Sequence, residues 1–277
     1  MKTQNQHVLI YDQDCPFCNW YTGAFVRKGF LLPEGRLPYK DALNDESLVF
    51  DEAVSRNKIA LVDRKTGEVL YGIDSLLAVF ANRFPLIQQI GTMKPVNYVL
   101  RVLYSFVSYN RKMIAPSDCN GSCNCTPTPS LPWRIAFIIF CALVVNLATG
   151  LYFSQQLAPY FTGDARYTDL ILFSSQFLFQ YIVFRLLKQR NFSDYAGNLA
   201  FVSLLGALLL LFFHFGLNIL SSAGMHIELL QPLCYGIVYM FMLREHARRL
   251  QLLHLTKWLT VSWIVFRFLI YPFAFIV

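Results

Sequence analysis

Long apolar runs in the second half of the chain constrain its fold more than any other feature of the sequence. An α-helix needs about 20 apolar residues to cross the hydrocarbon core of a bilayer. Five segments beyond Pro132 come near that length, and the fourth of them is the shortest: 133–153, 169–187, 197–220, 229–243 and 258–277. The sequence therefore predicts an all-α transmembrane bundle of about five spans.

The first half of the chain has a different composition, and this difference predicts two domains. Charged residues make up 15% of the whole chain, below the roughly 25% of an average soluble protein. Up to about residue 124, however, charges are as frequent as in a soluble domain. The segment "TPTPSLP" between the two parts has the prolines of a linker. We expect a soluble domain over residues 1–125, a Pro-rich linker over 126–132 and a membrane domain over 133–277.

The first half alternates predicted strands and helices, which is typical of a small α/β domain. Strands are expected over 7–11 and 36–39, and helices over 16–28 and 45–55. The stretch "KIALVDRKTGEVLYG" predicts a hairpin of two strands, 59–62 and 69–71.

A helix is expected after this hairpin, with the Asp74 carboxylate capping its first turn. The segment 95–110 that follows is amphipathic. It either lies on a membrane surface or packs on the sheet.

The chain is basic, with a formal net charge of +7. Most of the cations lie beside apolar runs, as membrane topology requires: Arg111, Lys112, Arg134, Lys188, Arg190, Arg244, Arg248, Arg249 and Lys257. Acidic residues offset the cations of the first half, so a basic patch for nucleic acid is not expected there. We predict no nucleic-acid partner.

Cation-rich and cation-poor loops alternate between the predicted spans. By the positive-inside rule, the N-terminal domain is predicted to be cytoplasmic and the C-terminus outside. The protein is then an integral membrane protein of a bacterial inner membrane or its equivalent. The amino end has one lysine and too short an apolar stretch for a signal peptide, so insertion is expected to depend on the later helices.

The stretch "LIYDQDCPFCNWYTGAFV" contains the residues with the clearest chemistry. Cys15 stands where a strand hands over to a helix, and the free N–H groups of a helix start lower a thiol pKa. Pro16 suits the first helical turn because it has no N–H. Cys18 follows one turn later and can resolve a mixed disulfide. Asp12 and Asp14 raise a thiol pKa, or they accept a proton from Cys18.

The pattern Asp12-x-x-Cys15-x-x-Cys18 after a short strand resembles the signature of the DCC family of predicted thiol-disulfide oxidoreductases. The family has similar residues at further positions of this sequence: Gly72, Asp74, Asn110 and Arg111. The resemblance covers roughly the first 120 residues, and Gln13 departs from it, since the family often has Gly there. It implies a thioredoxin-like fold for the N-terminal domain and redox activity at the two cysteines, and it names no substrate.

A zinc site is the alternative use of these thiols, because structural zinc takes four thiolates or imidazoles. Cys15 and Cys18 supply two ligands, and Cys119, Cys123 and Cys125 can complete the set. The spacing C-x-x-x-C-x-C of this second cluster argues against zinc. The same three thiols can instead relay electrons to the first pair, or carry palmitoyl groups at the membrane entry.

Ionisable side chains inside predicted spans are costly, so each is a candidate for function. Arg267 lies in the middle of "WIVFRFLIYP" and is expected to face other helices, a bound anion or a lipid headgroup. His214 in "LLFFHFGLN" can bind a quinone or a metal, or it can form a hydrogen bond to a neighbouring helix.

These observations favour a membrane-anchored thiol-disulfide oxidoreductase, an enzyme in which Cys15 attacks a disulfide and Cys18 releases the product. Its expected partners are the lipid bilayer and a protein or small-molecule disulfide. The dithiol itself is the redox group, so no further cofactor is expected, with zinc as the alternative. Two other functions stay open: a lipid- or solute-handling membrane protein with a non-catalytic thioredoxin-like adaptor, and a structural zinc-binding module on a membrane anchor.

Overall fold

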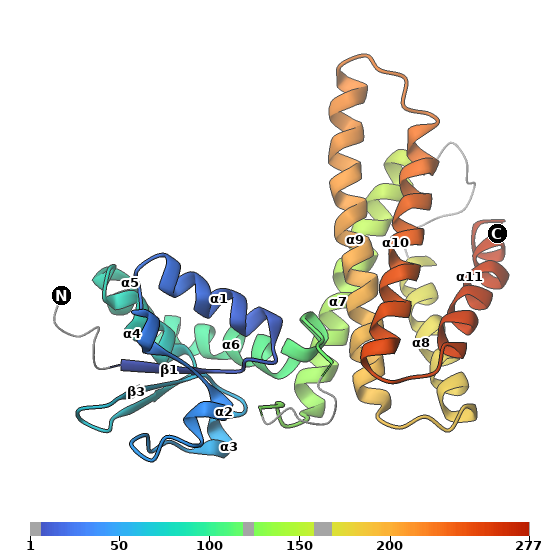
Figure 1. Ribbon diagram of the computed structural model, residues 1–277. Coiled ribbons are helices and arrows are strands. Elements are labelled where there is room, and N and C mark those ends of the chain that lie inside the picture. Colours follow the sequence, from blue (N-terminus) through green and yellow to red (C-terminus); the bar gives the residue numbers. More distant parts are fainter. Residues whose placement is uncertain (1–6, 119–124, 158–167, 277) are drawn as a thin grey trace. The chain divides into compact units, whose positions relative to one another are not determined.

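The structure is a computed structural model that describes residues 7–118, 125–157 and 168–276 (Figure 1). The predicted site residues Cys119 and Cys123 lie outside these ranges. The chain forms two compact units, unit 1 over Met1–Trp133 and unit 2 over Arg134–Val277.

A four-stranded mixed sheet organises unit 1. Its strands are β1 (His7–Tyr11), β2 (Arg36–Pro38), β3 (Ala60–Asp63) and β4 (Val69–Tyr71), in the order β2-β1-β3-β4. β1 pairs with β2 in parallel and with β3 antiparallel, and β3 pairs antiparallel with β4. The hairpin predicted around Lys65–Gly67 is therefore confirmed.

The two faces of the sheet carry separate apolar clusters, because side chains alternate along each strand. Leu9 and Leu61 pack on one face with Phe25 of α1 (Pro16–Arg27) and Val79 of α4 (Ile73–Ala81). The opposite face packs against α2 (Tyr39–Ala42), and its cluster includes Val8, Ile10, Ala60 and Val62. Figure 1 shows helices on both faces of the sheet.

The helix predicted over 45–55 is wrong. The structure has α2 before this segment and the short α3 (Glu52–Ser55) at its end, with non-helical backbone between them. The Asp45 carboxylate accepts a hydrogen bond from Ser47 N at 3.1 Å, and such local bonds compete with a helix. Asp51 then caps α3 by accepting from Val54 N at 3.0 Å.

The predicted cap at Asp74 is also wrong, since α4 begins from Gly72 and no side chain caps it. Gly72 has φ of +66°, and its N–H donates to Ile59 O at 2.8 Å. Asp74 lies in the first turn, where its carboxylate pairs with Arg101. The backbone geometry of glycine, rather than a carboxylate, therefore sets the start of this helix.

Two further helices complete unit 1: α5 (Pro85–Thr92) and α6 (Lys94–Ile114). The end of α6 packs inside the unit, where Ser108, Arg111 and Met113 are buried. Tyr104 OH accepts a hydrogen bond from Ile59 N at 2.8 Å and so ties α6 to the sheet. The first half of the helix exposes apolar side chains: Tyr98, Val99, Val102 and Leu103.

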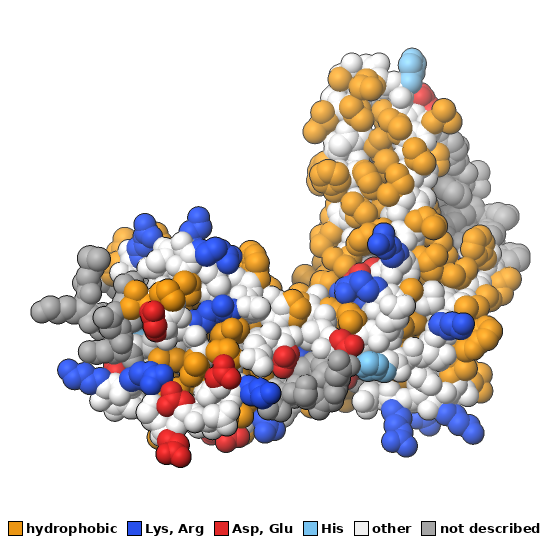
Figure 2. Space-filling model, in the orientation of Figure 1, with side chains coloured by type: hydrophobic (Ala, Val, Ile, Leu, Met, Phe, Trp, Pro, Cys, Tyr) orange, Lys and Arg blue, Asp and Glu red, His pale blue; other side chains and the backbone are white. Residues whose placement is uncertain are grey.

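Unit 2 is helical in its described part. α7 (Leu131–Tyr152) continues as a π-helical segment (Phe153–Leu157), and the remaining helices are α8 (Thr168–Leu186), α9 (Phe192–Ser222), α10 (Leu230–Leu252) and α11 (Trp258–Ile276). Hydrophobic side chains cover much of its surface (Figure 2).

The predicted fold class is wrong. Within the described residues, two helical stretches are long and apolar enough to cross a membrane, Leu131–Leu157 and Phe192–Ser222, rather than about five. The apolar parts of α8 and α11 are shorter, and α10 runs on to Leu252 through the cations that the sequence suggested for a loop. In unit 1 the structure establishes a small mixed sheet with helices, and a thioredoxin-like domain is not shown. The two candidate spans indicate membrane association.

Gly72→Ala is expected to destabilise unit 1 by about 1–3 kcal/mol, because L residues rarely adopt its conformation. A Cβ there would also lie 3.2 Å from Tyr104 Cε1. Amide hydrogen exchange of β3 in the full chain measures the change as a free energy of opening. Gly23→Ala in α1 is the matched control and should keep or raise that free energy, since alanine favours helix. Equal losses from both variants would contradict the role of Gly72.

Candidate functional site

The candidate site lies in the turn between the end of β1 and the start of α1. Asp12 turns the chain, since its carboxylate accepts from Asp14 N at 3.1 Å and its carbonyl accepts from Cys15 N at 3.4 Å. Cys15 is the N-cap of α1, and its Sγ accepts a hydrogen bond from Cys18 N at 3.3 Å. Pro16 is the first residue of the helix. The predicted residues of the motif therefore come together in one turn.

The environment separates the pKa values of the two thiols. The pKa of Cys15 is lowered from 9.0 to about 7, mainly because its sulfur accepts a hydrogen bond from the Cys18 side chain. Burial raises this pKa, whereas the Cys18 N–H and the charge of Arg111 lower it further. The pKa of Cys18 is raised far above its ordinary value, because its proton is held by Cys15 and the group is buried. Cys15 is thus the thiolate of the pair and Cys18 the thiol.

Both cysteines are free and buried. Cys15 is 0% exposed and Cys18 is 7% exposed. The sulfur that ionises more easily is therefore the one with no contact with solvent in this conformation. A substrate can reach Cys15 only after the residues around it move.

A buried ion pair lies beside the thiols. Arg111 Nη2 is 3.0 Å from Asp12 Oδ2, and both side chains are almost fully buried. The same nitrogen donates to Arg56 O at 3.1 Å and to the carbonyl oxygen of Cys125. Burial lowers the pKa of Arg111, but the anionic forms of Cys18, Cys125 and Asp12 together raise it above its ordinary value. Arg111 therefore stays charged next to the dithiol.

The structure brings Cys125 to this site as well. Its Sγ lies 3.6 Å from Arg111 Nη2 and 3.8 Å from Ser55 O. Burial raises the pKa of Cys125 to about 12, against the effect of Arg111, so this thiol keeps its proton. No group of three or more Cys, His, Asp or Glu side chains suited to a metal occurs among the described residues, a set that lacks Cys119 and Cys123.

A cavity of about 430 Å³ adjoins the dithiol within unit 1. Cys18, Asp12, Arg111 and Cys125 line it, and so do apolar side chains of α1, α4 and α6. Cys15 is not among its lining residues. The ion pair and two of the thiols therefore form part of the wall of a cavity that is otherwise mostly apolar.

His214, a predicted intramembrane candidate, is engaged by two amides. Its Nδ1 lies 3.4 Å from Gln156 Nε2, and its Nε2 lies 3.1 Å from Asn218 Nδ2. Gln156 also donates to Asn218 Oδ1 at 2.7 Å. Both ring nitrogens therefore lie beside amide nitrogens of a buried network of unit 2, which favours the predicted hydrogen bond to a neighbouring helix.

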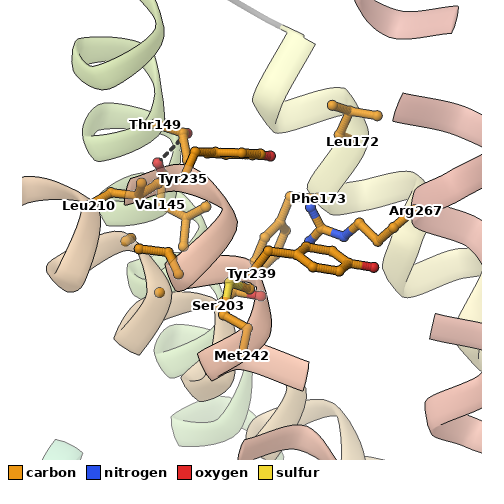
Figure 3. Close-up of a pocket in the computed structure, with 13 residues that line it drawn as sticks. Val145, Thr149, Leu172, Phe173, Ser203, Leu210, Tyr235, Tyr239, Met242 and Arg267 are labelled. Atoms are coloured by element: carbon orange, nitrogen blue, oxygen red, sulfur yellow. Dashed lines mark hydrogen bonds between the residues drawn. The ribbon is translucent and has the colours of Figure 1, made fainter. Parts of the chain in front are cut away.

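Arg267, the other intramembrane candidate, lines a cavity of about 40 Å³ in unit 2. Its guanidinium extends toward Phe173 and Tyr239 (Figure 3), and its Cζ lies 5.2 Å from the ring centroid of Trp263. A water molecule needs roughly 10–15 Å³ of such space, so the cavity is large enough for a few waters and too small for a lipid headgroup.

A buried network around His246 was not predicted. Tyr195 OH donates to Gln180 Oε1 at 2.8 Å and lies 3.2 Å from His246 Nε2. His246 Nδ1 is 3.1 Å from Thr260 Oγ1. The sequence "REHARR" suggested a charged loop, and its position inside α10 explains why these residues were missed.

Arg249 was expected in the same loop and is instead buried in unit 2. Its Nη1 donates to Asn198 Oδ1 and its Nε to Glu245 Oε1, both at 2.7 Å. The four-residue spacing of Glu245 and Arg249 was the available signal, because it places both side chains on one face of a helix.

Comparison with protein-family models, with curated proteins and with solved structures found no match for this chain.

The thiolate of Cys15 is expected to titrate with a midpoint near pH 7. Its ultraviolet absorbance in the full chain measures this. The pKa of Cys15 in the folded chain lies below its ordinary value of 9.0. The Cys15 thiolate therefore adds its full stabilisation to the folded state above pH 9, and this stabilisation is lost as the pH falls through 7. Cys18→Ala removes the main cause, so the midpoint should move up toward 9. An unchanged midpoint would contradict the assignment.

The Asp12–Arg111 pair is expected to be strongly coupled. Arg111→Met should cost about 3–5 kcal/mol, because it leaves Asp12 as an uncompensated buried charge. The double variant Arg111→Met/Asp12→Asn should lose less stability than the sum of the losses of the two single variants. Hydrogen exchange of β1 measures both, and Arg101→Met is the control, since its exposed pair with Asp74 contributes about 1 kcal/mol or less. Additive losses from Arg111→Met and Asp12→Asn would contradict the coupling.

Proposed function

We propose that this chain is a membrane-anchored thiol-disulfide oxidoreductase of the DCC type, whose Cys15 and Cys18 reduce or exchange disulfides. The observation that carries the proposal is that the two thiols at the start of α1 differ in pKa: the pKa of Cys15 is lowered and that of Cys18 is raised. Cys15 Sγ accepts the Cys18 N–H at 3.3 Å, and its pKa of about 7 leaves a thiolate at neutral pH. Disulfide exchange requires such a nucleophile and a second thiol within reach.

In the proposed reaction the Cys15 thiolate attacks one sulfur of a substrate disulfide. A mixed disulfide forms, and the other substrate sulfur leaves as a thiolate that takes a proton. Cys18 then gives up its proton and attacks Cys15 Sγ, which closes the Cys15–Cys18 disulfide and releases the second substrate thiol. The protein loses two electrons and the substrate gains them, and a cellular thiol reductant returns the protein to the dithiol.

Arg111 has a positioning role in this proposal. As a cation buried beside both sulfurs, it lowers the pKa of Cys15 and favours the negative charge that moves between sulfurs during exchange. Asp12 holds Arg111 through the ion pair at 3.0 Å. This arrangement replaces the sequence-based idea that Asp12 accepts a proton from Cys18. Arg111 and Asp12 are also positions at which the chain resembles the DCC family.

The proposal puts unit 1 in the cytoplasm, because Arg111, Lys112 and Arg134 lie before or at the start of the first candidate span, Leu131–Leu157. A cytoplasmic site is kept reduced, which favours a reductase or a redox sensor over an oxidase.

A non-catalytic adaptor is the second candidate, and the burial of the sulfurs favours it. Cys15 is 0% exposed, and structural cysteines in closed surroundings are inert. In this case the dithiol packs unit 1 and the membrane phenotype depends on unit 2.

The two candidates are separated by serine variants of the full chain. Cys15→Ser should abolish disulfide reduction, because no thiolate is left to attack. Cys18→Ser should accumulate a mixed disulfide on Cys15 in cells, and mass spectrometry of the trapped species identifies the partner. Cys141→Ser, at a lone buried cysteine of unit 2, is the control and should keep activity. Unchanged reduction in Cys15→Ser would contradict the enzyme, and a membrane phenotype untouched by both variants would support the adaptor.

A further inference from the structure

The cavity beside Cys18 has the size and walls of a small-molecule site. Its volume of about 430 Å³ lies within the roughly 300–1,000 Å³ of ligand pockets. Aromatic and aliphatic side chains make up most of its wall, among them Phe17 and Phe25 of α1, Phe80 of α4, and Leu103 and Val107 of α6. Such a wall favours an apolar ligand, because burial of apolar surface is the main gain on binding.

The charges at this cavity compensate each other. Asp12 and Arg111 are the charged side chains among the described residues that line it, and they pair at 3.0 Å. A ligand that is charged on entry would lose its hydration without gaining an unpaired countercharge, because each of these two side chains already has one. The cavity therefore favours an uncharged molecule.

Two buried polar atoms at this cavity have no hydrogen-bond partner in the described part of the chain. They are Ser55 Oγ and Arg111 Nε, and both residues line the cavity and are at least nine-tenths buried. Buried donors without partners are rare. A ligand atom with a lone pair would satisfy them, and the sulfur that becomes a thiolate during exchange is such an atom.

The route to the dithiol also favours a small molecule. Cys18 lines the cavity, whereas neither cysteine presents more than 7% of its surface to solvent. Leu103 lines the cavity and is 56% exposed, so the cavity opens on the apolar first half of α6. The Cys18 thiol is thus approached through the cavity rather than across the protein surface, which favours a compact molecule over the disulfide of a folded protein.

We infer that this cavity is the substrate site of the dithiol and that it binds an uncharged, largely apolar small-molecule disulfide. The inference rests on the proposed function and narrows its substrate class. The disulfide lies beside Cys18 with one sulfur toward Ser55 Oγ and Arg111 Nε, and its apolar groups fill the cavity toward Leu103. Cys15 does not line the cavity, so the two-step reaction given above begins when the residues around Cys15 move and bring its Sγ to the bound disulfide; the sulfur facing these donors then leaves as the thiolate.

The test uses the pre-reduced full chain in detergent micelles and two disulfides of nearly equal size. Dipropyl disulfide is apolar, and bis(2-hydroxyethyl) disulfide carries a hydroxyl in place of each terminal methyl. Mass spectrometry after an acid quench follows formation of the Cys15–Cys18 disulfide. Each rate is divided by the rate with a free cysteine peptide, which removes intrinsic reactivity. The normalised rate should be at least about tenfold higher for dipropyl disulfide, since two hydroxyls lose their hydration when they are buried in a mostly apolar cavity.

Two tryptophan variants on α6 locate the site. Leu103→Trp fills the mouth of the cavity and should slow oxidation by dipropyl disulfide at least about tenfold. Val102→Trp, its neighbour outside the cavity wall, is the matched control and should react as the wild type does.

Ser55→Ala removes one unpaired donor and should slow oxidation by dipropyl disulfide several-fold, without changing the Cys15 titration midpoint.

The outcomes distinguish the inference from the function on which it rests. Failure of the wild type to form the Cys15–Cys18 disulfide with any disulfide overturns the proposed oxidoreductase. Equal normalised rates for the two small disulfides, a faster reaction with a protein disulfide, or no effect of Leu103→Trp overturns the substrate site and leaves the oxidoreductase standing.

Discussion

The buried ion pair between Asp12 and Arg111 is the interaction on which the rest of unit 1 depends. It joins the end of β1 to the last turns of α6, which lie far apart in sequence. The same guanidinium holds the carbonyl groups of Arg56 and Cys125, so four segments meet at one cation. A lone charge in this place would be costly, and the pair therefore specifies the arrangement of these segments. It also puts a permanent positive charge beside two thiols.

The dithiol takes its chemistry from this setting. A helix start supplies an N–H to Cys15 Sγ, Cys18 supplies a thiol hydrogen bond, and Arg111 supplies charge. The same setting limits access, since both cysteines are buried and Cys18, but not Cys15, lines the apolar cavity. The two properties fit one substrate type, a small apolar disulfide that enters the cavity.

Local patterns predicted the strands, the hairpin and the Cys15 junction, because each depends on residues near in sequence. The cap at Gly72 was missed, since a positive φ leaves no mark in the sequence beyond the glycine itself. Arg111 was read as a membrane-flanking cation, and its partner Asp12 could not be found without the long-range packing of α6 on the sheet. The number of spans was overestimated because apolar helices pack inside a helical unit as well as in a bilayer. His246 and Arg249 were missed for the related reason that α10 continues past its apolar part.

We propose that Cys15 and Cys18 form a reversible redox couple, and an equilibrium redox titration of the full chain examines this without the need for a known substrate. The protein is equilibrated with dithiol and disulfide buffers over a range of ratios, and mass spectrometry measures the oxidised fraction of this pair. The account predicts a single two-electron transition whose midpoint becomes more reducing as the pH rises, because oxidation releases protons. A pair that stays reduced at every ratio, or thiols that are protected by a bound metal ion, would contradict it.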